Sequence, residues 1–139
     1  EWKRVEFFEE PRSVIDAIDP DGVNVVDYLD VLDEHWKVGI YINQIFEFLR
    51  NGMALVALQK KSSTDIAKGG EVTLERPRLY LSMSRRHYGD PVRSLKIIKI
   101  KNWRDQRKSP EGFQTTFTIE PGNIFNQMVP WGYFFEEDL

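Results

Sequence analysis

The order of apolar and polar residues predicts a strand–helix–strand unit in the first half of the chain. Two apolar runs, at 23–27 and 53–58, are typical of strands in a parallel sheet. Between them, residues 39–51 have apolar side chains at the i, i+3, i+4 and i+7 spacing of a helix: Ile42, Ile45, Phe46 and Leu49. Asn51 and Gly52, which tolerate left-handed backbone, are expected to end this helix. A crossover helix of this length allows the two strands to be parallel neighbours.

The second half alternates between apolar and polar residues, as half-buried strands do. Leu79, Leu81 and Met83 alternate with polar neighbours in the strand predicted at 78–83. Further strands are predicted at 93–101 and 113–119, and short turns between them favour antiparallel hairpins. The polar segment 60–76, with its two adjacent glycines, reads as a mobile loop, and residues 126–139 read as an aromatic tail.

The predicted fold class is therefore α/β, with parallel strands, a crossover helix and an antiparallel extension of the same sheet at 77–125. The length of 139 residues fits a single domain over 1–139. Before the first buried strand, we expect a short strand at Val5–Phe8, a short helix or turn at Arg12–Ile18, and a tight turn at Asp19–Gly22.

Composition excludes several classes of site. The chain has no cysteine, which excludes disulfides and thiolate metal sites and fits a cytoplasmic protein. No apolar run is long enough to span a bilayer and no signal-peptide pattern is present, so no membrane partner is expected.

Charge is segregated along the chain although the net charge is only −3. Residues 1–34 contain three basic and eleven acidic residues, a net charge of −8, whereas residues 59–108 contain fourteen basic and five acidic residues, a net charge of +9. This asymmetry predicts either a basic binding surface or a head-to-tail contact between subunits, and it is also compatible with a solvated surface.

Two polar residues follow the predicted parallel strands. Asp27 ends the first strand, where a carboxylate can orient Mg²⁺ beside phosphates, and Asp30 is a second acidic candidate nearby. Gln59 ends the second strand, where an amide can sense a γ-phosphate and move the loop that follows. Taken alone, each residue is better explained by a strand that simply leaves the core. The pair predicts a nucleotide and Mg²⁺ site along one edge of the sheet.

Basic residues form two further groups of candidates. Lys99 and Lys101 are expected on the same strand face as Leu95 and Ile97, where they could reach phosphates of a neighbouring subunit, and Arg104 extends this run. The loop contains basic residues and glycines that suit contact with a nucleic-acid backbone: Lys60, Lys61, Lys68, Gly69 and Gly70. A solvated strand end and an ordinary loop are the alternatives.

Other combinations of polar residues are less specific. The spacing of His35 relative to Asp30, Asp33 and Glu34 matches no helical pair of metal ligands. A metal-dependent hydrolase using Asp27 and Asp30 would need a third ligand that the sequence does not identify.

Taken in order, these motifs resemble parts of RecA/DnaB-type ATPases from phage-like sources. The segment 24–29 is similar to the Walker B strand and 57–61 to the sensor strand. The segments 64–70 and 76–81 are similar to the following loop and strand, and 97–102 to the lysine-x-arginine-asparagine run of replicative helicases, with Lys101 in place of the arginine. The resemblance implies a RecA-like core, a ring or filament of subunits, and ATP-driven work on single-stranded DNA in replication or recombination. By this likeness Asp27 would serve Mg²⁺, Gln59 would sense the γ-phosphate, and Lys99 and Lys101 would act in trans.

The chain also departs from this family in two parts that normally lie upstream of the Walker B strand, the phosphate loop and the catalytic glutamate. No G-x-x-x-x-G-K-[S/T] phosphate loop occurs in the 139 residues. We therefore expect a carboxyl-terminal part of such an ATPase that hydrolyses no ATP by itself. The alternative is a RecA-like module that only binds a partner or nucleic acid, without catalysis.

Overall fold

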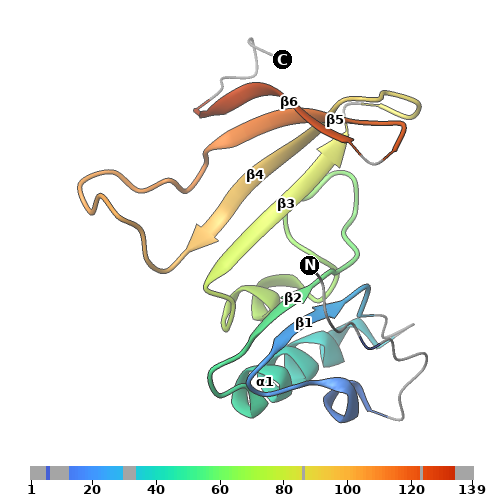
Figure 1. Cartoon of the computed structure of the whole chain (residues 1–139), viewed down its shortest axis with the longest axis vertical. Helices are drawn as coiled ribbons and strands as arrows, with labels where there is room; N and C mark the ends of the chain where they lie inside the picture. The colour runs from blue at the N-terminus through green and yellow to red at the C-terminus, as the bar shows by residue number, and fades with distance from the viewer. Residues whose placement is uncertain (1–5, 7–12, 30–33, 86, 123, 134–139) are drawn as a thin grey trace. The chain divides into compact units, whose positions relative to one another are not determined.

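The computed structural model describes residues 6, 13–29, 34–85, 87–122 and 124–133. The fold is mixed α/β, with a parallel pair of strands, one α-helix and an antiparallel four-stranded sheet (Figure 1). The elements in chain order are η1 Val14–Ala17, β1 Val23–Val26, η2 His35–Lys37, α1 Val38–Phe48, β2 Met53–Val56, η3 Gly70–Leu74, β3 Leu79–Arg85, β4 Arg93–Ile100, β5 Gln114–Glu120 and β6 Ile124–Gly132.

The chain divides into two compact units, where the sequence analysis expects a single domain. The first unit comprises residues 1–59 and 67–76, and the second comprises residues 60–66 and 77–139. The prediction that antiparallel strands extend the parallel sheet is wrong, because the hydrogen-bonded order is β1-β2 in one sheet and β3-β4-β5-β6 in another. Antiparallel strands can pair with their neighbours in sequence through short turns, so this sheet forms without the parallel pair.

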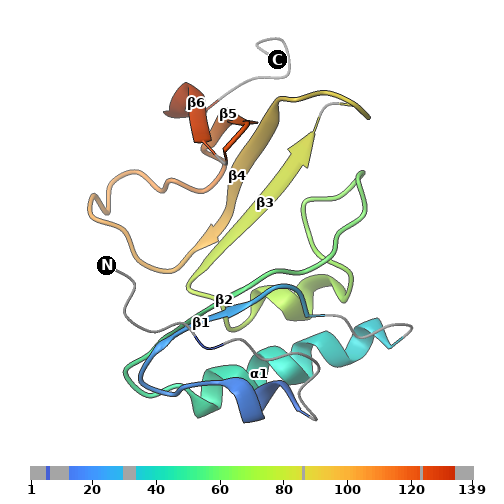
Figure 2. The ribbon, with the colours of Figure 1, turned by 45° about the vertical axis from the view of Figure 1, so that its right-hand side comes forward.

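The first unit has the predicted strand–helix–strand arrangement. β1 and β2 are parallel and in register from the pair Val23 and Met53 to the pair Val26 and Val56. Helix α1 connects them and runs along the pair (Figure 2). Its apolar stripe is buried at Val38, Ile42 and Ile45. Among the described residues, no helix combines the length and hydropathy needed to cross a membrane.

The parallel strands are less buried than their apolar sequence predicts. Val23 and Val25 of β1 are 75% and 67% exposed, and their partners on β2, Met53 and Leu55, are 57% and 61% exposed. The alternate residues are more covered, and Asn24 is 8% exposed. The prediction of buried strands therefore holds for one face only, since within the described residues only that face of the pair is covered.

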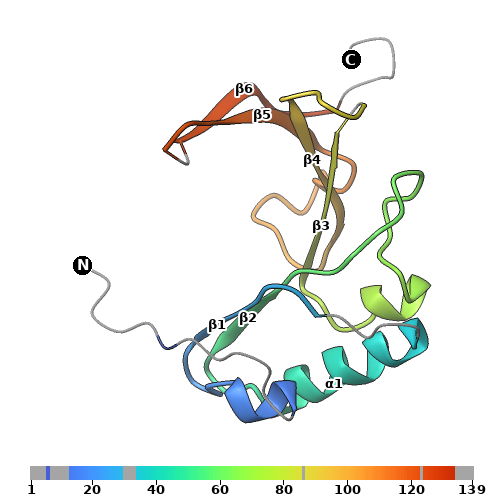
Figure 3. The same cartoon turned by 90° about the vertical axis from the view of Figure 1, so that its right-hand side faces the viewer.

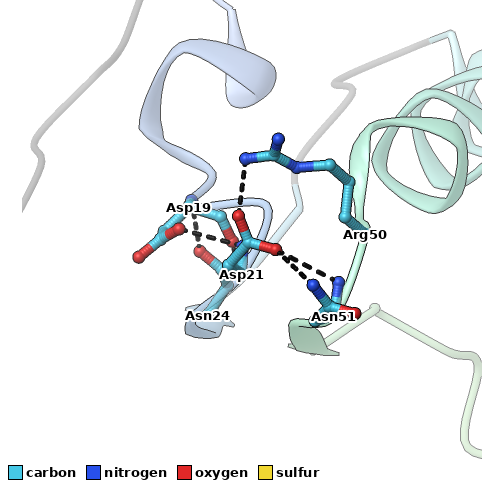
Figure 4. A network of polar contacts seen from close by, with 5 residues as sticks. All are labelled: Asp19, Asp21, Asn24, Arg50 and Asn51. Atoms are coloured by element: carbon cyan, nitrogen blue, oxygen red, sulfur yellow. Dashed lines mark hydrogen bonds and ion pairs between the residues drawn. The ribbon is translucent and has the colours of Figure 1, made fainter.

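A polar network holds the start of β1 against the junction of α1 and β2 (Figure 4). The Asp21 carboxylate accepts hydrogen bonds from the Arg50 guanidinium at 2.5 Å and from the Asn51 side-chain amide at 3.0 Å. The Asn24 amide donates to the carbonyl oxygens of Asp19 at 2.8 Å and Met53 at 3.1 Å. The predicted Asp19–Gly22 turn is thus part of the contact between the two strands.

The end of α1 differs from the prediction. The helix ends at Phe48, and Leu49 caps it in an extended conformation. Asn51 and Gly52 therefore do not terminate the helix with left-handed backbone. Gly52 is required for a different reason: a Cβ atom there would lie 2.5 Å from the carbonyl oxygen of Gly22.

The second unit is a strongly curved antiparallel sheet (Figure 3). Its strands β3, β4 and β5 correspond to the predicted strands at 78–83, 93–101 and 113–119. The segment predicted as an aromatic tail instead contributes strand β6, Ile124–Gly132, which pairs with β5. Phe125 of β6 stacks on Phe117 of β5 with ring centroids 4.6 Å apart. Tyr133, an aromatic residue of the predicted tail, packs edge-to-face on Phe113 with ring centroids 4.5 Å apart.

Strand β3 alternates as predicted, but its polar side is the covered one. Tyr80 and Ser82 are 9% and 3% exposed, whereas Leu79, Leu81 and Met83 are 50%, 39% and 55% exposed. Segment 60–66 covers part of this polar side of β3, because Lys60 bonds to Ser84 and Asp65 bonds to Ser82. The segment 60–76 also contains helix η3, with Thr73 fully buried, and so has more local structure than the predicted loop.

Several predictions fall on positions outside the described residues. These are Asp30, Asp33, most of the strand predicted at Val5–Phe8, and residues 134–139. The short helix predicted at Arg12–Ile18 is confirmed as η1, Val14–Ala17.

Candidate functional site at the end of the parallel strands

Asp27 and Gln59 follow the same end of the parallel pair. Asp27 comes directly after β1, and the pairing continues beyond it, because the Val26 carbonyl accepts from the Ala57 amide at 2.9 Å and the Ala57 carbonyl accepts from the Leu29 amide at 3.0 Å. Gln59 lies two residues beyond Ala57. Both side chains are exposed, and the Asp27–Tyr28 peptide bond is cis. The end of the sheet therefore presents a carboxylate and an amide to solvent.

Gln59 is bonded to a residue of the predicted nucleic-acid loop. Its backbone carbonyl accepts from the Lys68 amide at 2.8 Å, and its side-chain oxygen Oε1 accepts from the Lys68 ammonium at 3.1 Å. The next residue, Gly69, has φ 111°, in the left-handed region that favours glycine. A Cβ atom there would lie 3.0 Å from the His35 carbonyl oxygen. Gln59 is therefore bonded to Lys68 through both its side-chain amide and its backbone carbonyl.

The other two lysines of that loop lie in the second unit. The Lys60 ammonium donates to the Thr64 carbonyl at 2.8 Å and to the Ser84 hydroxyl of β3 at 2.9 Å. These bonds hold the segment against β3, so Lys60 has a structural contact in addition to its predicted role. Lys61 is exposed. The predicted loop residues are thus divided between the units, with Lys60 and Lys61 in the second and Lys68, Gly69 and Gly70 in the first.

Asp65 is the acidic centre of the contact between segment 60–66 and the antiparallel sheet. Its carboxylate accepts from the Ser82 hydroxyl at 3.1 Å and from the Lys96 ammonium at 2.9 Å. Partial burial raises the pKa of Asp65. The hydrogen bonds from Lys96 and Ser82, together with the charges of Lys96 and Lys60, lower this pKa by more than burial raises it. The net pKa lies below the ordinary value, so this carboxyl stays ionised near neutral pH.

A bulge in β4 changes the predicted position of Lys99. Tyr80 pairs with Lys99 but the next residue, Leu81, pairs with Ile97, so Ile98 is an extra residue in β4. Residues directly opposite each other share a face of the sheet. Lys99 therefore lies on the face of Tyr80, and the prediction that it shares the face of Leu95 and Ile97 is wrong.

The remaining members of the second basic group lie beyond β4. Lys101 follows the strand, and its amide donates to the Arg78 carbonyl at 2.9 Å. Arg104 lies in the exposed turn region after it. The sequence predicts that a phosphate of a neighbouring subunit contacts Lys99, Lys101 and Arg104. This contact stays a prediction.

The Mg²⁺ role that the sequence predicts for Asp27 stays a prediction. An exposed carboxylate on a strand end is a hard oxygen ligand of the kind that Mg²⁺ takes, with water or phosphate oxygens completing the shell. Within the described residues no three His, Asp or Glu side chains gather as a metal-binding group. Of the His35 combination, Glu34 forms an ion pair with Lys37 at 2.5 Å.

Two features of this region were not foreseen from the sequence. The Asp65 contact and the pairing of Lys68 with Gln59 each join a residue of the polar segment 60–76, which has no periodic pattern, to a partner outside that segment. The sequence identifies Asp65 and Lys68 as charged residues, but it does not predict their partners, because these depend on the tertiary fold.

Comparison of the chain with protein-family models, with curated proteins and with solved structures finds no match.

Proposed function

We propose that this chain forms part of a RecA/DnaB-type ATPase core that binds ATP and Mg²⁺ as a homo-oligomer and acts on single-stranded DNA. One observation carries the proposal: Asp27 and Gln59 follow the same end of two neighbouring parallel strands. A carboxylate for Mg²⁺ and an amide for a γ-phosphate are two of the groups that phosphoryl-transfer enzymes use at such an edge.

The contact between Gln59 and Lys68 supplies a route from nucleotide to DNA. The Lys68 ammonium donates to Gln59 Oε1 at 3.1 Å. In this proposal a phosphate that recruits the Gln59 amide weakens its hold on Lys68. The ammonium then becomes available to a DNA phosphate, and the following glycines let the backbone adjust.

Fluorescence anisotropy with a labelled oligothymidylate tests the DNA-binding part of this proposal. We expect binding at low salt that weakens steeply as salt rises, because affinity for a phosphate backbone is electrostatic. Replacing Lys61 and Lys68 by alanine should weaken binding and reduce the salt slope by about 0.7, the value for one lost contact with a single strand, because Gln59 occupies Lys68 in the absence of nucleotide.

Gln59→Ala gives a more discriminating test, because it should strengthen DNA binding whereas the lysine substitutions weaken it. It removes the acceptor that occupies Lys68, so DNA binding should strengthen and the salt slope should rise by up to about 0.7. Gln44→Ala, an exposed amide on α1, is the matched control and should leave binding unchanged. No binding at low salt, or unchanged binding by the lysine variant, would overturn the proposed DNA function.

A further inference from the structure

Strands β3 and β4 carry a continuous aliphatic face. Leu79, Leu81 and Met83 of β3 are 50%, 39% and 55% exposed. Opposite them on β4 lie Ile100, Ile97 and Leu95, in that order. The bulge at Ile98 is what keeps this face continuous, because it moves Lys99 to the other face and brings Ile100 into line with Leu79.

Two arginines follow at one end of the aliphatic face. Arg85 is directly opposite Arg93, two residues beyond the Met83 and Leu95 pair, so the two arginines share the face of that pair by alternation. Like charges opposite each other destabilise a sheet. The Arg93 guanidinium donates to the Asp90 and Val92 carbonyls, and the Arg85 guanidinium lies 4.9 Å from the Tyr88 ring centroid. Within the described residues neither guanidinium forms an ion pair with a carboxylate.

We propose that this face binds an acidic amphipathic helix of a partner protein. An apolar sheet face is normally buried by a helix, and arginine side chains bind carboxylates through charge-assisted hydrogen bonds. From Leu79 to Arg85 the strand extends about 20 Å, which matches a helix of about 13 residues. The partner's apolar stripe would cover the aliphatic residues, and its glutamates or aspartates would meet Arg85 and Arg93.

Nucleic acid fits this face less well than a peptide. Single-stranded nucleic acid is held by aromatic side chains that stack on its bases. The three rungs of the face carry only leucine, isoleucine and methionine. Lys61 and Lys68, the lysines tested above for DNA, are not on β3 or β4. The inference therefore does not rest on the proposed ATPase function.

The test uses the full chain and a designed, fluorescein-labelled helical peptide with a leucine stripe and glutamates in its first turn. We expect anisotropy to report binding, and Arg85→Glu to weaken it by about tenfold. Arg107→Glu, another exposed arginine but outside the sheet, is the control and should have no such effect. A peptide carrying lysines in place of the glutamates should bind Arg85→Glu better than it binds the original chain.

The outcomes separate this inference from the DNA proposal. Peptide binding should survive the Lys61 and Lys68 substitutions and should be lost when the leucine stripe is scrambled at constant composition. The inference would be overturned if the peptide does not bind. It would also be overturned if the peptide affinity is unchanged both by Arg85→Glu and by scrambling the leucine stripe. Oligothymidylate binding that depends on Arg85 while the peptide does not bind would overturn it as well, in favour of a nucleic-acid face.

Discussion

Asn24 shows how one polar side chain can organise an apolar strand. It is 8% exposed within β1. Its side-chain oxygen accepts from the Asp19 amide at 2.8 Å, and its side-chain nitrogen donates to carbonyls of the preceding turn and of Met53. A buried polar group must be hydrogen-bonded to be tolerated. Asn24 therefore joins the turn, β1 and β2 at the end of the pair opposite to Asp27.

Asn24→Ala should destabilise the protein by about 2 kcal/mol, because the Asp19 amide and the Met53 carbonyl lose a partner in a buried site. Urea unfolding followed by circular dichroism measures this as a lower midpoint. The control is Asn43→Ala, which removes only a surface contact to Glu47 and should change stability by about 0.5 kcal/mol or less. Equal effects of both substitutions would contradict the role assigned to Asn24.

At the scale of the element, the junction between α1 and β2 depends on close backbone approach. The amides of Arg50 and Gly52 both donate to the Pro20 carbonyl, at 2.8 Å and 3.0 Å. A Cβ atom on Gly52 would lie 2.5 Å from the Gly22 carbonyl oxygen and 2.8 Å from the Pro20 carbonyl oxygen. Backbone atoms cannot yield as a flexible side chain can, so the junction requires glycine.

Gly52→Ala should therefore cost about 2–3 kcal/mol through overpacking. In a thermal melt this corresponds to a Tm lower by roughly 5–10 °C. Gly132→Ala is the control, since Gly132 ends β6 with nothing within 4 Å of the Cβ position, and its Tm should stay within about 2 °C. A Gly52 variant as stable as the Gly132 variant would show that the junction can relax.

Local patterns predict the elements of this chain better than they predict how the elements pair. The apolar stripe of α1 and the apolar runs of β1 and β2 are short-range features, and the crossover between parallel strands follows from them. The separation into two sheets, the strand β6 and the bulge at Ile98 depend on contacts between distant residues. For the site, strand order predicts that Asp27 and Gln59 share an edge, but the bonding of Gln59 to Lys68 is a tertiary contact.

At the scale of the whole molecule, charge segregation and exposed apolar strands favour contact between copies. Residues 1–34 have a net charge of −8 and residues 59–108 a net charge of +9. The parallel pair exposes Val23, Val25, Met53 and Leu55. Complementary charges steer a head-to-tail approach, and such heterologous contacts produce rings or filaments.

We therefore predict that the chain self-associates at low ionic strength and dissociates as NaCl approaches about 0.5 M, where screening shortens the range of these charges. Sedimentation velocity over a range of protein concentrations measures the association. Asp16→Lys, within the acidic segment, should weaken it by about threefold. Glu120→Lys makes the same charge change outside both segments and should have little effect.

A single species at every ionic strength would contradict the prediction. Association that persists in high salt would also contradict it, because the contact would then depend on the exposed apolar strands rather than on charge.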